Sequence, residues 1–317
     1  MTSLNSTLRY IARSVFYLMN YFLLSTFFAC GVSARAEDSN EFAAVVETSR
    51  KYYQLAGQTY RTINGQSLKV DVFRPRPEGP PMPVLVYFHG GGWMTGDKER
   101  AVLHVTPFLS QGWVAFNVAY RLGKVAQAPA GAEDCICALK WILKNAATYR
   151  ADMNRVVLMG HSAGGHLALL SAFAPEVGGA CPGDMPRVRA IVNWYGISDV
   201  ADLIDGANKR EFAQGWIGNG PGRFELANRL SPIRYVRAGV PPVISIHGDL
   251  DDTVPFAHSV RLDAALRSVS VPSELIRIPG AKHGQFSEQQ YLNAYRKVIK
   301  FVEANASEDK PVAGRKP

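Results

Sequence analysis

Residues 155–170 read RVVLMGHSAGGHLALL, and this stretch decides the fold. Residues 155–159 form a short apolar run typical of a buried strand, and residues 166–170 continue as a helix. Between them, GHSAG at 160–164 matches the pattern G-x-S-x-G. A serine on such a sharp strand-to-helix turn presents its hydroxyl above the sheet. The sequence therefore predicts Ser162 as a nucleophile at the end of a strand.

Strand and helix patterns alternate along most of the chain. Asn64-Gly65 lies between alternating apolar residues, which predicts a hairpin over 59–73. Repeated strand-then-helix units predict a mostly parallel, doubly wound sheet that begins with this antiparallel hairpin. A polar helix is expected at 37–56 and a loop at 75–83. Further strands are expected at 84–88, 113–118, 155–159, 188–194, 243–246 and 274–278, and helices at 132–145, 162–173, 256–268 and 288–305.

The charge balance argues against a nucleic-acid-binding protein. The chain has 317 residues and a net charge of +8, without a cluster of lysines and arginines. Residues 1–36 contribute three positive charges and no negative one, so without them the net charge is +5. Positive charge spread along the whole chain is typical of a solvated surface, whereas nucleic-acid-binding proteins gather it on one face.

Residues 1–36 have the pattern of a targeting segment. Two arginines precede a mostly apolar run at 15–29, and small residues at 32–36 offer cleavage sites. The run is short for a membrane span, which needs about 20 residues. We therefore predict a cleaved secretory signal and an exported protein, periplasmic or secreted. An uncleaved membrane anchor and a lipid attached to Cys30 remain open as alternatives.

The cysteine pattern favours neither a metal site nor a disulfide framework. Cys135, Cys137 and Cys181 follow the N-terminal segment, and their spacing matches no zinc motif. Cys135 and Cys137 are two residues apart on an expected helix, so they do not face each other. A bridge from either of them to Cys181 stays open for an oxidising compartment. We expect buried, unbonded cysteines.

One domain is expected over 37–306, because the sequence shows no internal repeat and no second core. The segment 199–240 interrupts the alternation of strands and helices. It is rich in glycine, contains Phe212 and Trp216, and is too long for a simple connection. We expect a helical insertion over the site there. The polar residues 307–317 are expected to form a disordered tail.

A serine hydroxyl is a weak nucleophile at neutral pH. It needs a basic side chain within hydrogen-bonding distance and an acid that orients this base. In a doubly wound sheet, such partners follow later strands at their carboxyl ends. Asp249, Asp251 and Asp252 follow the strand at 243–246, and His283 follows the last strand. The sequence predicts His283 as the base and one of the aspartates as the orienting acid.

Backbone donors for a developing oxyanion are expected after another strand. Residues 89–93 read HGGGW directly after the strand at 84–88, and glycines there leave backbone N–H groups free. The N–H of Ala163, at the start of a helix, supplies a further donor. A phosphate-binding loop fits poorly, because Gly96 is followed by Asp97 and not by lysine.

Taken together, these motifs resemble the esterases of the α/β-hydrolase superfamily. The resemblance covers residues from about 55 to 305 and rests on HGGGW, GDK, AYRL, GHSAGG, HGxxDxxVP and KHG in this order. It is strongest toward hormone-sensitive-lipase-like carboxylesterases, kynurenine formamidases and bacterial acetyl or feruloyl esterases. It implies a mostly parallel eight-stranded sheet with an N-terminal antiparallel hairpin and helices on both faces.

The resemblance also implies roles for single residues. The family acid is the aspartate of D-x-x-V-P, which selects Asp251 over its two neighbours. Gln285 departs from the family pattern, in which an aromatic residue often follows K-H-G. This departure does not affect the three residues to which the resemblance assigns the catalytic roles. The implied site consists of the nucleophile Ser162, the base His283, the acid Asp251 and the oxyanion donors Gly91, Gly92 and Ala163.

The implied function is hydrolysis of small or short-acyl carboxylic esters through an acyl-enzyme, without cofactor or metal. An arylformamidase, which would cleave an amide of formate, remains an alternative, and so does a catalytically silent binding protein on the same fold. Trp93, Trp194 and Tyr195 follow strands that lead into the site. They are candidates for a substrate pocket, with core packing as the other expectation. Acyl length, alcohol and oligomeric state stay open.

Three other polar residues have structural roles in this interpretation. His161 and His166 flank the serine turn, but H-E-x-x-H is absent and no ligand spacing surrounds them. We expect them to pack or to cap the turn. Asp134 lies on the helix before the serine strand and is expected to form structural hydrogen bonds.

Overall fold

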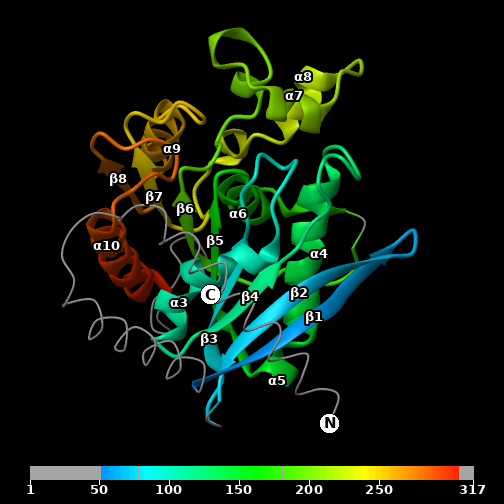
Figure 1. Ribbon diagram of the computed structural model, residues 1–317, viewed down its shortest axis with the longest axis vertical. Coiled ribbons are helices and arrows are strands. Elements are labelled where there is room, and N and C mark those ends of the chain that lie inside the picture. Colours follow the sequence, from blue (N-terminus) through cyan, green and yellow to red (C-terminus); the bar gives the residue numbers. More distant parts are fainter. Residues whose placement is uncertain (1–50, 77–78, 180, 307–317) are drawn as a thin grey trace, which may run out of the picture. The chain divides into compact units, whose positions relative to one another are not determined.

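The computed structural model describes residues 51–76, 79–179 and 181–306. Eight strands form one sheet in the order β1-β2-β4-β3-β5-β6-β7-β8, as Figure 1 shows. β1 and β2 form an antiparallel hairpin, β2 is also antiparallel to β4, and all other neighbours are parallel. The predicted mostly parallel sheet with an N-terminal hairpin is therefore confirmed. The strands are β1 (Tyr52–Ile63), β2 (Gln66–Pro75), β3 (Met82–Phe88), β4 (Val114–Val118), β5 (Ala151–His161), β6 (Val188–Trp194), β7 (Val243–Gly248) and β8 (Ser273–Ile278).

Apolar side chains cover both faces of the central strands, as expected for parallel strands between two helical layers. In β3, Val84 and Val86 belong to one buried cluster, whereas Leu85 and Tyr87 belong to the cluster on the opposite face. The helices divide in the same way. One face is covered by α4 (Ala130–Lys144), α6 (Ala163–Phe173) and α9 (Ala257–Ser268), and the other by α3 (Val102–Leu109) and α10 (Glu288–Ala306).

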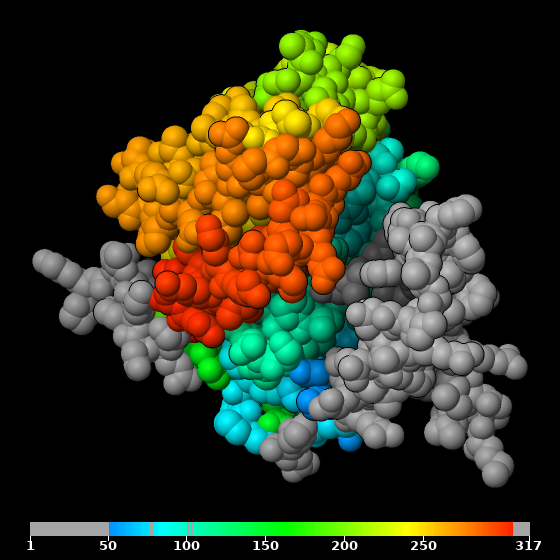
Figure 2. Space-filling view, turned by 60° about the vertical axis from the view of Figure 1, so that its left-hand side comes forward, coloured from blue at the N-terminus to red at the C-terminus, as the bar shows by residue number. Residues whose placement is uncertain are grey.

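The segment 199–240 contains short helices at the end of the sheet where the parallel strands terminate (Figure 1). In Figure 2 it forms the green end of the molecule, next to the yellow and orange residues that follow β7. Arg210 ties this segment to the loop after β7, because its guanidinium donates to the carbonyl groups of Asp252 and Thr253 at 2.9 Å each. The helices are η3 (Ala201–Leu203), η4 (Gly206–Asn208), α7 (Glu211–Ile217), α8 (Arg223–Arg229) and η5 (Pro232–Tyr235).

Two secondary-structure expectations need correction. The helix expected at 37–56 is wrong over its last residues, because β1 begins at Tyr52 and pairs there with Pro75 of β2. The helix α3 was not anticipated.

The expectations for residues 1–36, 37–50 and 307–317 fall outside the described residues. Within the described ranges, none of the helices combines the length and apolarity that crossing a bilayer demands. The remaining short helices are η1 (Lys98–Ala101), α5 (Ala146–Tyr149) and η2 (Pro175–Gly178).

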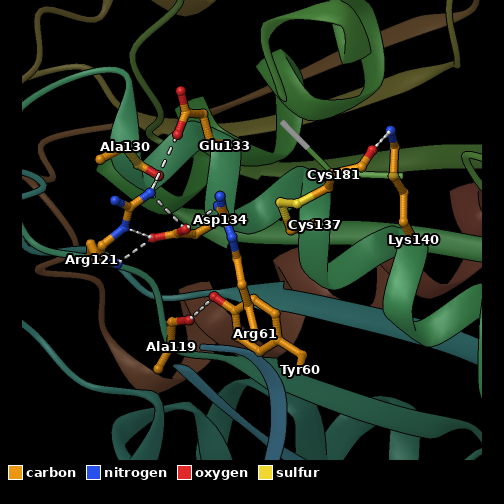
Figure 3. The surroundings of a disulfide bond; sticks show 10 residues. All are labelled: Tyr60, Arg61, Ala119, Arg121, Ala130, Glu133, Asp134, Cys137, Lys140 and Cys181. Carbon is orange, nitrogen blue, oxygen red and sulfur yellow. Dashed lines mark hydrogen bonds and ion pairs between the residues drawn. A yellow bond between two sulfur atoms is a disulfide. The ribbon is translucent and has the colours of Figure 1, made fainter. Parts of the chain in front are cut away.

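The expectation of unbonded cysteines is also wrong. Cys137 of α4 forms a disulfide with Cys181, which lies 44 positions further along the chain, and the two Cα atoms are 5.5 Å apart (Figure 3). Lys140, one turn along α4, donates a hydrogen bond to the Cys181 carbonyl at 2.6 Å. Cys135 is buried and free. The spacing of the cysteines in the sequence could not decide this pairing, because only the folded chain brings the loop with Cys181 next to α4.

Asp134 joins α4 to the hairpin and to the loop after β4, as Figure 3 shows. Its carboxylate is fully buried and accepts hydrogen bonds from Arg61 at 2.8 Å and from Arg121 at 2.7 Å and 2.9 Å. Two guanidinium groups thereby neutralise a charge that burial would otherwise make costly. The expected structural role of Asp134 is confirmed.

Candidate active site

Ser162 lies on the turn that joins β5 to α6. Its backbone has φ 53° and ψ −120°, a positive-φ conformation that residues other than glycine rarely adopt. The turn packs tightly because Gly164 lacks a side chain, and a Cβ there would collide with the carbonyl oxygen of Phe88. The Ser162 N–H donates to the Trp194 carbonyl at 2.9 Å, which fixes the turn against β6. The strained turn therefore holds the hydroxyl at the end of the sheet.

Two side chains from later loops approach this hydroxyl. His283 follows β8, and its Nε2 lies 2.9 Å from Ser162 Oγ. Asp251 follows β7, and its Oδ2 lies 2.6 Å from His283 Nδ1. The structure thus brings all three residues, which are far apart in the sequence, into one line of hydrogen bonds.

The neighbouring aspartates point elsewhere. Asp249 is paired with Arg277 at 2.7 Å and accepts the N–H of Gly280 at 2.7 Å. The carboxylate of Asp252 is more than half exposed and lies 3.3 Å from Lys282 Nζ. Asp251 is therefore the aspartate of this loop that the fold presents to the histidine.

The Asp251 carboxylate is surrounded by hydrogen-bond donors. Its Oδ1 accepts the backbone N–H groups of Thr253 and Val254 at 2.9 Å and 2.8 Å. Its Oδ2 faces His247 Nε2 at 3.1 Å in addition to His283. Burial by itself would raise the pKa of Asp251, but the hydrogen bonds from the two histidines outweigh it and hold the pKa far below its ordinary value. Asp251 is therefore a charged carboxylate at neutral pH.

The predicted oxyanion donors lie on two loops that border the serine. Gly91 and Gly92 have φ values of 115° and 59°, in the region that favours glycine. Ala163 is the first residue of α6, where the helix dipole favours negative charge. Among the hydrogen bonds of the described residues, none has the N–H of Gly91, Gly92 or Ala163 as its donor. These N–H groups are therefore available to a ligand oxygen.

A cavity of about 390 Å³ opens beside Ser162. It brings together the glycine loop after β3, the ends of β5 and β6, the loops after β7 and β8, and one side chain of α7. A larger cavity of about 480 Å³ beside the start of β8 contains none of the predicted site residues. The residues that line the cavity at the serine are Gly90, Gly91, Gly92, His161, Ser162, Tyr195, Phe212, Thr253 and His283.

The three aromatic pocket candidates occupy different positions. Tyr195 lines the cavity, and its ring meets the imidazole of His283 edge-on with centroids 4.7 Å apart. Trp93 and Trp194 are fully buried and do not line the cavity. Trp93 stacks on Trp216 of α7 at 4.2 Å. Trp194 stacks on His161 at 5.4 Å. Both tryptophans support the walls of the cavity from behind.

The two histidines beside the serine are packed, as expected. His161 Nδ1 lies 3.0 Å from the hydroxyl of Tyr87, and His161 is one of the residues that line the cavity. His166 accepts the indole N–H of Trp93 at 3.1 Å, so its Nε2 carries the proton and donates to the Leu230 carbonyl at 2.7 Å. His166 therefore links the glycine loop to the segment 199–240.

Two fully buried histidines and one partly buried histidine make the stability of the fold dependent on pH. Burial lowers the pKa of His104, His166 and His258 to about 4, against 6.5 in the unfolded chain. Between these two pH values the unfolded chain binds more protons than the folded one. The free energy of unfolding therefore keeps its full value above pH 6.5 and decreases as the pH falls toward 4. At pH 5 the loss is about 2 kcal/mol per histidine.

We therefore expect urea unfolding at pH 5 to show a clearly lower free energy of unfolding than at pH 7. His166→Gln removes one of the three groups and is expected to make this pH dependence less steep. An unfolding free energy that is equal at both pH values in the unsubstituted protein would contradict the assignment of neutral buried imidazoles.

Sequence reasoning missed the roles of Phe212, Thr253 and His247. Phe212 and Thr253 line the cavity, and His247 contacts the Asp251 carboxylate. A signal existed for His247, because it directly follows the apolar residues 243–246 and begins the pattern H-G-x-x-D. Within the described ranges, no three His, Cys, Asp or Glu side chains are grouped so that they could hold a metal ion.

The known proteins to which the chain is similar include esterases. The BD-FAE family model matches residues 70–266. Esterase LipQ of Mycobacterium tuberculosis is 30% identical over 236 residues, which cover 69% of this chain and 54% of that protein. Esterase LipC of the same organism is 31% identical over 231 residues, with 68% and 56% covered. The chain thus spans about half the length of these curated relatives.

Solved structures share the fold over most of the described residues. Thermogutta terrifontis esterase 2, in a form phosphoramylated by tabun, has a TM-score of 0.68 and 26% identity, and 80% of this chain and 97% of that chain are covered. A truncated carbohydrate esterase from gut microbiota has a TM-score of 0.70 and 22% identity, with 80% and 98% covered. The second likeness concerns the fold alone.

Proposed function

The chain belongs to the BD-FAE family of α/β-hydrolase-fold esterases, and from this premise we propose that it is a serine carboxylic-ester hydrolase for small or short-acyl esters. The observation that carries the proposal is the continuous line of hydrogen bonds from Asp251 through His283 to Ser162. This is the arrangement by which a base activates a serine hydroxyl while a carboxylate orients the base.

Acylation begins when Ser162 Oγ attacks the ester carbonyl carbon and His283 Nε2 accepts the hydroxyl proton. The carbonyl oxygen becomes an oxyanion, which the N–H groups of Gly91, Gly92 and Ala163 stabilise. The tetrahedral intermediate collapses, the bond to the alcohol oxygen breaks, and His283 gives its proton to this oxygen. Asp251 keeps the imidazole in the required tautomer and stabilises its cationic form.

Deacylation repeats these steps with water. His283 takes a proton from the water as its oxygen attacks the acyl-enzyme carbonyl, and the same backbone groups stabilise the second oxyanion. When the bond to Ser162 Oγ breaks, the proton passes from His283 to the serine and the carboxylic acid leaves. The free enzyme is thereby restored.

The volume and the lining of the cavity favour a substrate with a small, uncharged acyl group. Its volume of about 390 Å³ is near the lower end for ligand pockets, and its lining contains no Asp, Glu, Lys or Arg side chain. Phe212 of α7 closes it on one side, since a Cβ on Gly92 would lie 3.0 Å from the Phe212 ring. The aromatic ring therefore lies directly against the glycine loop and restricts the length of the substrate.

Phe212→Ala is expected to shift the chain-length preference toward longer acyl groups. Each additional buried methylene contributes about 0.8 kcal/mol, or roughly fourfold in kcat/KM. Opening the wall should raise the ratio of kcat/KM for p-nitrophenyl octanoate over acetate by about tenfold. Phe224→Ala is the matched control, because Phe224 lies on α8 of the same segment, is 44% exposed and does not line the cavity. Equal ratios in both variants would contradict the proposed wall.

A substrate panel tests the function itself. The full chain is incubated with p-nitrophenyl esters of increasing acyl length and with N-formylkynurenine, and a fluorophosphonate probe reports the activated serine. We expect ester turnover and labelling of Ser162. Preferential cleavage of the formamide would favour an arylformamidase, and absence of both turnover and labelling would favour a silent binding protein.

We also propose that the protein is exported. The support comes from the signal-like pattern at 1–36 and, independently, from the Cys137–Cys181 disulfide, since such bonds persist in oxidising compartments. Determining the N-terminal residue of the protein isolated from cells tests this. An N-terminus after residue 34 or 36 is expected. An intact Met1 would contradict cleavage, and a lipidated Cys30 at the N-terminus would indicate a lipid anchor instead of release.

A further inference from the structure

The carboxylate of Asp251 receives hydrogen bonds from two imidazoles. His247 lies in β7, directly before the loop that carries Asp251, and its side chain is fully buried. Its Nε2 is 3.1 Å from Asp251 Oδ2, the same oxygen that lies 2.6 Å from His283 Nδ1. The base and a second histidine thus contact the same carboxylate oxygen.

The surroundings of His247 fix which nitrogen carries the proton. Nε2 also lies 3.0 Å from the carbonyl oxygen of Val254, which can only accept, so Nε2 is a donor. On the opposite edge of the ring, Nδ1 lies 2.7 Å from Ser259 Oγ on α9. In the neutral imidazole, Nδ1 accepts the Ser259 hydroxyl proton. Ser259 is itself buried, so this contact is closed to solvent.

We propose that His247, held by Ser259, is a positioning residue that extends the catalytic line to Ser259–His247–Asp251–His283–Ser162. The inference rests on the proposed function, because it assumes that Asp251 orients the base. With two backbone donors on Oδ1 and two imidazoles on Oδ2, the carboxylate cannot rotate without breaking a hydrogen bond. His247 therefore aims Oδ2 at His283 Nδ1 and shares the negative charge of this oxygen.

Sharing of the charge has a measurable consequence. His283 must be unprotonated to act as the base, and the acidic limb of the kcat/KM profile reports its protonation in the free enzyme. A donor on Asp251 weakens the attraction between the carboxylate and the His283 proton. If the His247 donor is removed, His283 retains its proton to higher pH, and the acidic limb moves to higher pH.

Three other titratable side chains near this line of hydrogen bonds are neutral between pH 5 and 8. Burial lowers the pKa of His161, at the end of β5, and that of His258, on α9, so both are neutral. Burial raises the pKa of Tyr195, at the end of β6, so it is neutral as well. Lys282 and Asp252 form an ion pair at the surface, and Arg210 is bound to backbone carbonyl groups. The acidic limb therefore reports the triad.

The experiment compares kcat/KM for p-nitrophenyl butyrate from pH 4.5 to 8.5 in the full chain and four variants. His247→Leu removes the donor and keeps an apolar side chain, whereas His247→Gln keeps an N–H near the position of Nε2. Ser259→Ala removes the group behind His247. His258→Gln is the matched control, because His258 is an equally buried histidine that does not contact Asp251.

We expect His247→Leu to lower kcat/KM at its optimum by about 10- to 100-fold, the range for a hydrogen bond to a charged group. Its acidic limb should move to higher pH by about half a unit or more. His247→Gln should restore most of kcat/KM and return the acidic limb close to its original pH. Ser259→Ala should move the acidic limb to higher pH, but by less than His247→Leu. His258→Gln should leave the limb in place.

Two results would overturn the proposal. One is an unchanged acidic limb in both His247→Leu and Ser259→Ala, and the other is an equal shift in His258→Gln. Thermal unfolding of each variant separates a loss of positioning from a loss of folding, and Ser259→Ala provides the test if His247→Leu does not fold. Turnover near that of the unsubstituted protein in Ser162→Ala would reject the proposed function. A severely impaired Ser162→Ala, together with an unchanged acidic limb in both His247→Leu and Ser259→Ala, would reject this inference alone.

Discussion

Ser162→Ala is expected to lower kcat for p-nitrophenyl butyrate by about 10⁵- to 10⁶-fold. The substitution removes the oxygen that lies 2.9 Å from His283 Nε2, so no acyl-enzyme can form at this position. The oxyanion donors and the cavity remain, and such groups alone still accelerate the reaction by about 10³-fold over water. The residual rate should therefore exceed the uncatalysed rate. Steady-state kinetics with a long observation time measures it.

Ser171→Ala is the matched control for this substitution. Ser171 is a buried serine of α6, the helix that begins directly after Ser162, and its hydroxyl has no hydrogen-bonding partner among the described residues. Its loss is expected to change kcat by less than about twofold, as for substitutions that remove no interaction. Turnover near that of the unsubstituted protein in Ser162→Ala would show that another group attacks the ester and would reject the mechanism.

The proposed triad was predictable because each member follows its own strand. In a parallel sheet the carboxyl ends of the strands meet along one edge, so Ser162, Asp251 and His283 had to lie near one another once the strands were identified. The order of the strands did not determine which of the three aspartates is the orienting acid. That choice depended on the family pattern D-x-x-V-P, and the structure gives the physical reason, since Asp249 is held by Arg277.

The cavity wall was not predictable in the same way. Phe212 reaches the glycine loop because α7 packs on Trp93 through Trp216, and this packing depends on the path of the whole segment 199–240. Periodicity predicts helices in such a segment but not the side chain that faces the site. Trp93 was a candidate because it follows β3, and Trp194 because it lies at the end of β6, yet residues at strand ends can face either layer.

Three further features were not predicted from the sequence, namely helix α3, the start of strand β1 and the disulfide. Helix α3 is eight residues long, contains Pro107 and has no acidic residue in its first turn, so it lacks the usual signals of a helix start. The strand β1 begins before the alternating pattern does, because it is an edge strand whose first residues are largely exposed. The Cys137–Cys181 bond depends on a long-range contact that spacing leaves undetermined.

Asp251→Asn is expected to lower kcat by about 10⁴-fold while the protein stays folded. The amide has nearly the shape of the carboxylate, but it carries no charge and can present an N–H group to His283 Nδ1. His283 would then place its own proton on Nε2, the nitrogen that must accept the proton of Ser162. The imidazolium formed during the reaction would also lose the charge that lies 2.6 Å from Nδ1 in the unsubstituted protein. Steady-state kinetics with p-nitrophenyl butyrate at several pH values measures the loss.

Asp249→Asn separates this effect from a general disturbance of the loop. Asp249 is two residues away and, like Asp251, accepts a backbone N–H, but its partners are Arg277 and Gly280 instead of a histidine. A change in kcat of about twofold or less is expected, because Asp249 does not belong to the line of hydrogen bonds that ends at Ser162. A similar loss in both variants would mean that the loop after β7 tolerates no neutral residue, and the assignment of Asp251 as the orienting acid would fall. A large loss confined to Asp251→Asn would instead tie catalysis to the one carboxylate that contacts both histidines.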